Sequence, residues 1–199
     1  MTGRTADVRL DALLSTACEV IARRGLANTR TADVAAAAGV SQALVFYHFE
    51  TKDNLLVRAF AYAADQELAR VETVVRSPGA PLDKVRRILK LYGPNTTKAW
   101  EMWIDGWAES IRVPELEKVS RRLDVRWKEA LAEVIRAGVA AGDFRCADPH
   151  GAAWRITALA DGLTVQATVH DRIISRRQLA EWIRLATARE LAVRPEQLV

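Results

Sequence analysis

The chain has little cysteine and no long apolar segment. Its only thiols, Cys18 and Cys146, lie far apart, so the sequence predicts no disulfide scaffold and a reducing environment. The longest apolar stretch, Val34 to Val40, is far too short to cross a bilayer. The first residues run directly into mixed polar sequence, which predicts no secretory signal peptide. These absences disfavour secreted and membrane-spanning classes, and we expect a cytoplasmic protein.

Histidine and the common catalytic motifs are also scarce. The chain has three histidines and contains no phosphate loop, dinucleotide fingerprint, nucleophile elbow or His-Glu-x-x-His motif. Cys146, Asp148 and His150 alternate closely enough to suggest a metal site, but the spacing suits a turn before a helix at Pro149 better. We therefore predict a protein that is not an enzyme and that has no metal site and no cofactor.

Sparse glycine and few β-branched runs, set against abundant leucine, alanine, arginine and glutamate, favour helix over sheet. Apolar residues at three-and-four spacing predict an all-α fold of about nine helices. Besides two short helices between residues 30 and 49, we expect helices over 7–24, 52–76, 82–92, 95–111, 115–141, 149–169 and 176–193.

The net charge of +4 permits a nucleic-acid partner without requiring one. Acidic and basic residues nearly balance in the first sixty positions. Any functional assignment must therefore rest on the pattern of residues and not on charge.

Residues 30–49 have the pattern of two short helices around a tight turn. The first helix has a small inner face made of Val34, Ala35 and Ala38. Gly39 ends this helix, Val40 fills the space between the helices, and Ser41 is a good N-cap for the second. Small residues, a turn glycine and an apolar plug are what a helix-turn-helix requires.

The second short helix has an inner and an outer side. A spacing of about 100° per residue places Val45 and Phe49 inside, with Phe46 at the edge. The outer side is small or polar and almost free of acid, as a helix entering a DNA major groove must be. Gln42, in the first turn, suits a bidentate contact to adenine, and Tyr47 suits phosphate or a thymine methyl.

Lys52 opens the next helix, where a cation is unfavourable against the helix dipole by about 0.3–1 kcal/mol. A DNA phosphate bound at the start of that helix would make the energetic contribution of the lysine favourable. The alternative is that a surface lysine tolerates the cost.

Residues from about 10 to 58 resemble the DNA-binding domain of TetR-family bacterial regulators. The matching pieces are the Gly25 helix end, Asp33-Val-Ala, Ala38-Gly-Val-Ser41, Phe46-Tyr-His-Phe49, and Lys52 followed by Leu55-Leu56. The resemblance implies a homodimer that binds double-stranded operator DNA. Motif and resemblance together predict DNA contacts by Thr29, Arg30, Thr31, Ser41, Gln42, Ala43, Leu44, Tyr47, His48 and Lys52. Arg30 departs from the family's usual capping threonine, so we expect the cap to move to Thr29 or Thr31. Phe46 departs from a common tyrosine.

A stripe of tryptophans predicts an effector site in the C-terminal part. The candidate ligand-binding residues are Tyr92, Trp100, Trp103, Ile104, Trp107 and Trp127. Large flat side chains often line pockets, but a helical aromatic stripe equally often fills a core, and both interpretations stay open. Glu101 and Asp105 flank the stripe, where they either recognise a cationic group or lie solvated at the surface.

The last two predicted helices carry a candidate dimer interface. Asp161-Gly-Leu163 resembles the last-but-one helix of many TetR-family members. The predicted dimerisation residues are Ile156, Leu159, Leu163, Ala167, Leu179, Trp182, Ile183 and Ala186. Burial within one monomer is the competing explanation. We favour the dimer because two operator half-sites need two reading heads.

The sequence thus predicts a DNA-binding domain over residues 1–52 and an effector-binding and dimerisation domain over 53–199. The expected function is transcriptional regulation, by a repressor that releases its operator when a small molecule binds. A helical adaptor that has lost DNA binding is the alternative, and salt-dependent affinity for duplex DNA separates the two.

Overall fold

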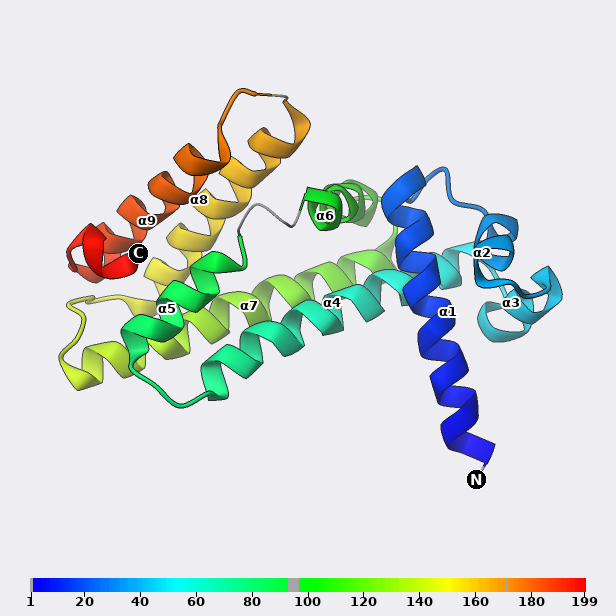
Figure 1. Ribbon diagram of the computed structural model, residues 1–199, viewed down its shortest axis with the longest axis horizontal. Helices are drawn as coiled ribbons and strands as arrows, with labels where there is room; N and C mark the ends of the chain where they lie inside the picture. Colours follow the sequence, from blue (N-terminus) through cyan, green and yellow to red (C-terminus); the bar gives the residue numbers. More distant parts are fainter. Residues whose placement is uncertain (1, 93–96, 171) are drawn as a thin grey trace. The chain divides into compact units, whose positions relative to one another are not determined.

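The computed structural model describes residues 2–92, 97–170 and 172–199, with side chains described from residue 10 onward and not for 97–99. This part of the chain is helical and contains no strand, which confirms the predicted all-α class (Figure 1). The helices are α1 (Thr2–Arg24), α2 (Thr31–Ala38), α3 (Gln42–Phe49), α4 (Lys52–Arg76), α5 (Pro81–Lys90), α6 (Thr97–Ser110), α7 (Pro114–Ala141), α8 (Pro149–Val169) and α9 (Arg176–Leu191), followed by a short 3-10 helix at Pro195–Leu198.

The chain forms two compact units. The first comprises the residues up to Glu67 together with Glu101–Leu123, and the second comprises Leu68–Trp100 and Asp124–Val199. The proposed DNA-binding segment therefore falls in the first unit. The functional boundary after residue 52 stays a prediction.

Phe60 of α4 belongs to the buried core of the first unit. The Phe60 side chain is fully buried, and its ring meets that of Trp103 edge to face at 5.0 Å between centroids. It also lies directly over Gly106, where a β-carbon would stand 2.1 Å from Phe60 Cε2. The small residue on α6 is thus what lets the two helices approach this closely.

Asp105 of α6 has a structural partner in the same unit. Its Oδ2 accepts a hydrogen bond from the backbone N–H of Leu26 at 3.1 Å, just beyond the end of α1. The prediction that Asp105 either recognises a cation or is solvated is therefore wrong, because this carboxylate holds the α1–α2 connection.

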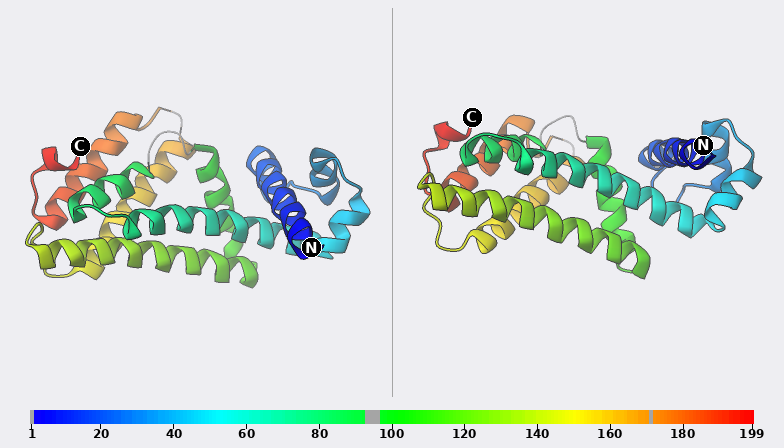
Figure 2. Two further views of the ribbon diagram at one scale, coloured as in Figure 1. Left: turned by 60° about the horizontal axis from the view of Figure 1, so that its bottom comes forward. Right: turned by 90° about the horizontal axis from the view of Figure 1, so that it is seen from below.

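The second unit has a larger aliphatic core. Its most deeply buried members come from α4, α5, α7, α8 and α9, and they include Val71, Val85, Ile88, Leu131, Ile135, Ile156 and Leu191. Removing each such side chain from water contributes about 1.5–3 kcal/mol to folding. In this unit α8 and α9 lie side by side, as both views of Figure 2 show.

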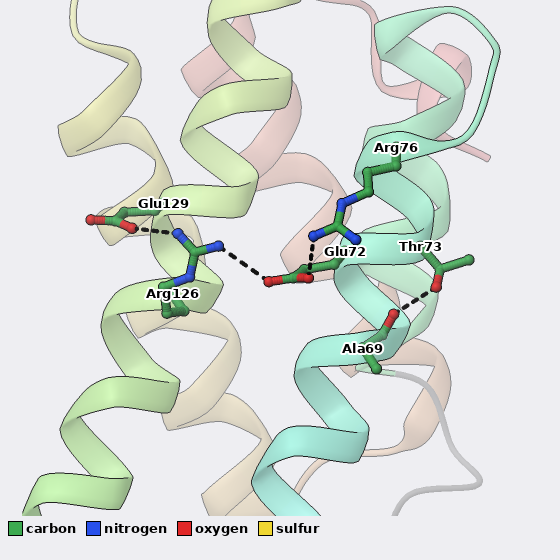
Figure 3. Close-up of polar contacts among 6 residues, drawn as sticks. All are labelled: Ala69, Glu72, Thr73, Arg76, Arg126 and Glu129. Carbon is green, nitrogen blue, oxygen red and sulfur yellow. Dashed lines mark hydrogen bonds and ion pairs between the residues drawn. The ribbon is translucent and has the colours of Figure 1, made fainter.

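Ion pairs line the surface where α4 and α7 run together in the second unit. The Arg126 guanidinium contacts Glu72 of α4 and Glu129 of its own helix, each at 3.1 Å, and Glu72 also pairs with Arg76 at 2.7 Å (Figure 3). These charges are largely exposed and balanced, so each pair contributes little to stability.

Candidate functional site

The α2–turn–α3 segment has the helix-turn-helix geometry expected from its sequence. Gly39 ends α2 with φ at 65°, a left-handed conformation that favours glycine. The N–H of Val40 then bonds to the carbonyl of Ala35 at 3.0 Å. Ser41 is the N-cap of α3, and its Oγ accepts a hydrogen bond from the N–H of Leu44 at 3.2 Å. The roles of Gly39 and Ser41 confirm the prediction, and the backbone bond of Val40 adds to it.

One side of α3 is buried and the other faces outward. Val45 and Phe49 are buried, whereas the Tyr47 side chain is 80% exposed. Leu44 and Phe46 are also exposed. The exposed side chains of Gln42 and Ala43 complete a surface with no acidic residue, and His48 is half-buried at its edge. A surface of this composition is compatible with base edges and phosphates.

The Gln42 side chain forms a hydrogen bond within the protein in the absence of DNA. Its Nε2 donates a hydrogen bond to the hydroxyl of Thr31 at 3.0 Å, and Thr31 is itself buried. The second N–H of the amide and its oxygen stay available for a base. Because the side chain is already ordered, less rotamer entropy is lost on binding.

The start of α2 differs from the expectation. Its N-cap is Arg30, whose backbone N–H donates to Asp33 Oδ2 at 3.1 Å, and Arg24 pairs with the same carboxylate at 3.1 Å. The predicted shift of the cap to Thr29 or Thr31 is therefore wrong. Thr29 is fully buried and its hydroxyl donates to the carbonyl of Gly25 at 2.8 Å, so its side chain has no access to DNA.

Lys52 lies at the first position of α4. Its Nζ donates to the carbonyl of Ala27 at 3.0 Å, which ties the start of α4 to the α1–α2 connection. Thr51 caps the helix through its hydroxyl, which accepts from the N–H of Asn54 at 3.1 Å. The lysine thus has a structural partner, and its phosphate contact stays a prediction.

Sequence reasoning missed Arg58 of α4. Its Nη1 donates to the carbonyl of His48 at 2.9 Å, and its guanidinium lies 5.0 Å from the centroid of the Phe49 ring. A cation at the C-terminus of α3 is favourable against the helix dipole. Arg58 therefore anchors the end of the exposed helix. Spacing along α4 alone could not reveal this contact, because it depends on how α3 and α4 cross.

The aromatic residues proposed for a ligand divide between the two units. Trp103 packs on Phe60 in the first unit, as the core interpretation predicted for the stripe. In the second unit the Tyr92 ring lies 6.1 Å from Trp100 and 5.8 Å from Trp127 between centroids. Ile104 and Trp107 are half-buried in the first unit.

Two acidic side chains, Asp161 and Asp124, lie near Tyr92. Asp161 of α8 is half-buried, and burial raises its pKa to about 6, helped by the charge of Asp124 and opposed by Lys128 and by a hydrogen bond from the Tyr92 hydroxyl. Burial also raises the pKa of Asp124 despite its neighbour Lys128. Burial and the charge of Asp161 keep Tyr92 neutral by raising its pKa well above the usual value.

We call Tyr92, Trp100, Trp127 and Asp161 the aromatic–carboxylate cluster. Lys128 Nζ lies 3.7 Å from Asp124 Oδ1, so one of the two nearby carboxylates has its countercharge. Above about pH 6 the half-buried Asp161 carboxylate therefore shares the single charge of Lys128 with Asp124, and it lies beside Tyr92, the ring that contacts Trp100 and Trp127. Trp127 Nε1 is also buried with no hydrogen-bond partner among the described residues. A carboxylate beside aromatic faces is the chemistry that binds an organic cation.

The proposed dimerisation residues are not all presented to a partner. Ile156, Leu179 and Ile183 are buried in the chain's own core. Leu163, Ala167 and Ala186 are half-buried, whereas Leu159 and Trp182 are exposed at 38% and 42%. Both α8 and α9 thus expose a large apolar side chain, and their pairing with a second copy stays a prediction.

The candidate metal ligands have other roles. Asp148 is the N-cap of α8 and accepts from the N–H of Gly151 at 2.8 Å, while the His150 ring lies near Trp154. In the part of the chain that the structure describes, no three metal-ligating side chains come together. None of the helices in that same part has the length and apolar character needed to cross a membrane.

Fold and surface together define a helix-turn-helix DNA-binding protein. Residues 13–59 match the family of bacterial regulatory proteins called the tetR family, and residues 81–192 match the C-terminal domain of BetI-type transcriptional repressors. The chain belongs to the TetR family. It is accordingly a DNA-binding transcriptional repressor that responds to a small molecule.

Relatives of known name support this assignment. The regulator BetI of Cronobacter sakazakii is 29% identical over 166 residues, covering 80% of this chain and 77% of the relative. A solved regulator from Saccharomonospora viridis in complex with choline is 28% identical, with a TM-score of 0.80 over 89% of this chain and 94% of that one. A TetR-family regulator from Rhodococcus sp. is 27% identical, with a TM-score of 0.76 over 92% and 98%.

Proposed function

We propose that this chain is a homodimeric repressor that contacts its operator through α3 and releases it when an organic cation binds the aromatic–carboxylate cluster. The observation that carries the proposal is the packing of Tyr92 against Trp100 and Trp127, with the half-buried carboxylate of Asp161 beside the same tyrosine. The choline bound by the Saccharomonospora viridis regulator supports the same ligand class. The proposed location is the cytoplasm, where the operator DNA lies.

The proposed DNA surface consists of the exposed side of α3 and the flanking helix starts. Its members are Arg30, Thr31, Ser41, Gln42, Ala43, Leu44, Tyr47, His48 and Lys52, with Thr29 now left out. Gln42 and Tyr47 would contact base edges, and Arg30 and Lys52 would contact phosphates. Thr31 acts through Gln42, whose amide it holds.

The proposed dimer uses the outer face of α8 and α9. Leu159 and Trp182 supply its exposed apolar centre, with Leu163, Ala167 and Ala186 beside them. Ile156, Leu179 and Ile183 support this face from inside the monomer. Burying an apolar patch of this kind drives association, and it places two reading heads on one operator.

Leu159→Glu is expected to convert the dimer into a monomer, because a charge would be buried at the apolar interface. Val125→Glu is a matched control, since Val125 of α7 has the same exposed fraction of 38% and lies outside α8 and α9. Light scattering after size exclusion should give half the mass for the first variant and an unchanged mass for the second. Equal behaviour of the two variants would argue against this interface.

The helix that begins at Lys52 is the proposed route of coupling. It contributes residues to both units and carries Arg58, which anchors the end of α3. Binding of the cation releases DNA only if it favours one arrangement of the two reading heads over the other. We expect the cation to favour the arrangement that does not fit the operator.

The function is tested with duplex DNA from the region flanking the chain's own gene. Fluorescence anisotropy should show saturable binding that weakens steeply with salt, since phosphate contacts release counterions. Choline should lower the affinity at constant ionic strength, with sodium chloride as the control for added salt. Equal binding of unrelated duplexes would refute specific operator recognition. Operator binding that choline does not weaken would refute release by an organic cation.

A further inference from the structure

We infer that Lys128 sets the charge of the effector, because it neutralises Asp124 and leaves the aromatic–carboxylate cluster with one carboxylate to satisfy. The site would then select a cation with a single charge over one with two. This inference rests on the proposed cationic effector and adds to it a residue that determines specificity.

Lys128 is an internal cation with fixed partners. Its side chain is buried, and its Nζ lies 3.7 Å from Asp124 Oδ1, one helical turn away on α7. The same ammonium lies 4.7 Å from the centroid of the Trp154 ring. A buried ammonium without such partners would be strongly disfavoured, so this geometry holds the charge in place.

Asp161 accepts a hydrogen bond from Tyr92, but among the described residues it has no ion pair like that of Asp124. The charged and titratable groups that act on it are Lys128 and Asp124 from α7 and Tyr92 in the turn after α5. Among the described residues, the ion pair of Lys128 within 4.0 Å is with Asp124 and not with Asp161. One ammonium thus serves two carboxylates, and the net charge of the three groups is −1 when both acids are ionised.

This net charge determines which ligand fits. A monocation brings the group to neutrality, whereas a dication adds a second charge close to a buried ammonium that repels it. Removing the charge of Lys128 leaves two unpaired carboxylates, which favours the dication. Removing the charge of Asp124 frees Lys128 to neutralise Asp161, so that the attraction for any cation falls.

The test uses two ligands that differ by one charged group, butyltrimethylammonium and 1,4-bis(trimethylammonio)butane. Their dissociation constants are measured by calorimetry on the full chain for wild type, Lys128→Met and Lys128→Arg. Wild type and Lys128→Arg should prefer the monocation. In Lys128→Met the ratio of the two constants should shift toward the dication by about tenfold or more.

Asp124→Asn provides a second variant in case Lys128→Met does not fold. It should bind the monocation about tenfold more weakly than wild type. An unchanged ratio in folded Lys128→Met, or unchanged monocation affinity in Asp124→Asn, would overturn the role of Lys128 while leaving the cationic effector intact. A wild-type chain that binds neither ligand would overturn both the effector class and this inference.

Discussion

Replacing Asp161 by asparagine is expected to abolish binding of the organic cation and to stabilise the chain. The substitution keeps the shape of the side chain and removes the net negative charge of the group formed by Asp161, Asp124 and Lys128. A pair of opposite charges about 4 Å apart at a protein surface interacts by about 4 kcal/mol, so the affinity for choline should fall by at least about 100-fold. Calorimetry with choline at pH 8 measures this loss.

The gain in stability follows from the pKa of Asp161, which burial raises from 3.8 to about 6. The folded chain binds this proton more tightly than the unfolded chain does. The associated stability is therefore complete below about pH 4 and is lost as the pH rises through about 6. Because the side chain is partly exposed, we expect a loss of about 2 kcal/mol between these limits.

Urea unfolding at pH 4.5 and pH 8 tests this sign. Asp161→Asn should lack the contribution of this group to the pH dependence and should exceed wild type in unfolding free energy at pH 8. Glu101→Gln is the control, since Glu101 is exposed on α6 and was the other carboxylate suggested for a cation. If Glu101→Gln loses choline binding and Asp161→Asn keeps it, the assignment of the cluster is wrong.

Replacing Tyr47 by alanine is expected to weaken operator binding by about 100-fold without affecting the fold. The side chain is 80% exposed, and surface substitutions of this kind usually change stability by less than about 0.5 kcal/mol. A dimer loses the contact in both reading heads, and a loss of about 1–2 kcal/mol at each adds to the stated factor. Anisotropy titrations with the operator duplex provide the measurement.

Ile111→Ala serves as the control for this substitution. Ile111 is as exposed as Tyr47, at 83%, and lies in the same compact unit but outside the helix-turn-helix. Its replacement should leave operator affinity unchanged. Operator binding that survives Tyr47→Ala and Gln42→Ala alike would remove α3 from the interface.

Structural features that depend only on residues close together in the sequence could be predicted. The glycine at position 39, the Ser41 cap and the alternation of Val45 and Phe49 with exposed neighbours depend on local backbone geometry and helical spacing. These short-range rules were enough to locate the helix-turn-helix. They were not enough for the cap of α2, where Asp33 binds the N–H of Arg30 and also attracts Arg24.

Contacts that depend on how distant helices pack against each other could not be predicted from the sequence. The hydrogen bond from Lys52 to Ala27 joins positions 25 residues apart. Arg58 contacts the C-terminal end of α3 only because α4 packs close to that end. The tryptophans of α6 share one helix, yet Trp100 and Trp103 have aromatic neighbours in different units. The sequence pointed to Asp161 only as part of a predicted dimer helix, because its proximity to Tyr92 depends on how distant segments pack.

The central claim is that the outward side of α3 lies against DNA, and photocrosslinking tests it most directly. A benzophenone side chain is introduced at position 47 in one variant and at position 111 in another, and each is irradiated with the operator duplex. Position 47 should crosslink to the duplex, with loss of the product on adding choline, and position 111 should not. Crosslinking from position 111 and none from position 47 would contradict the account.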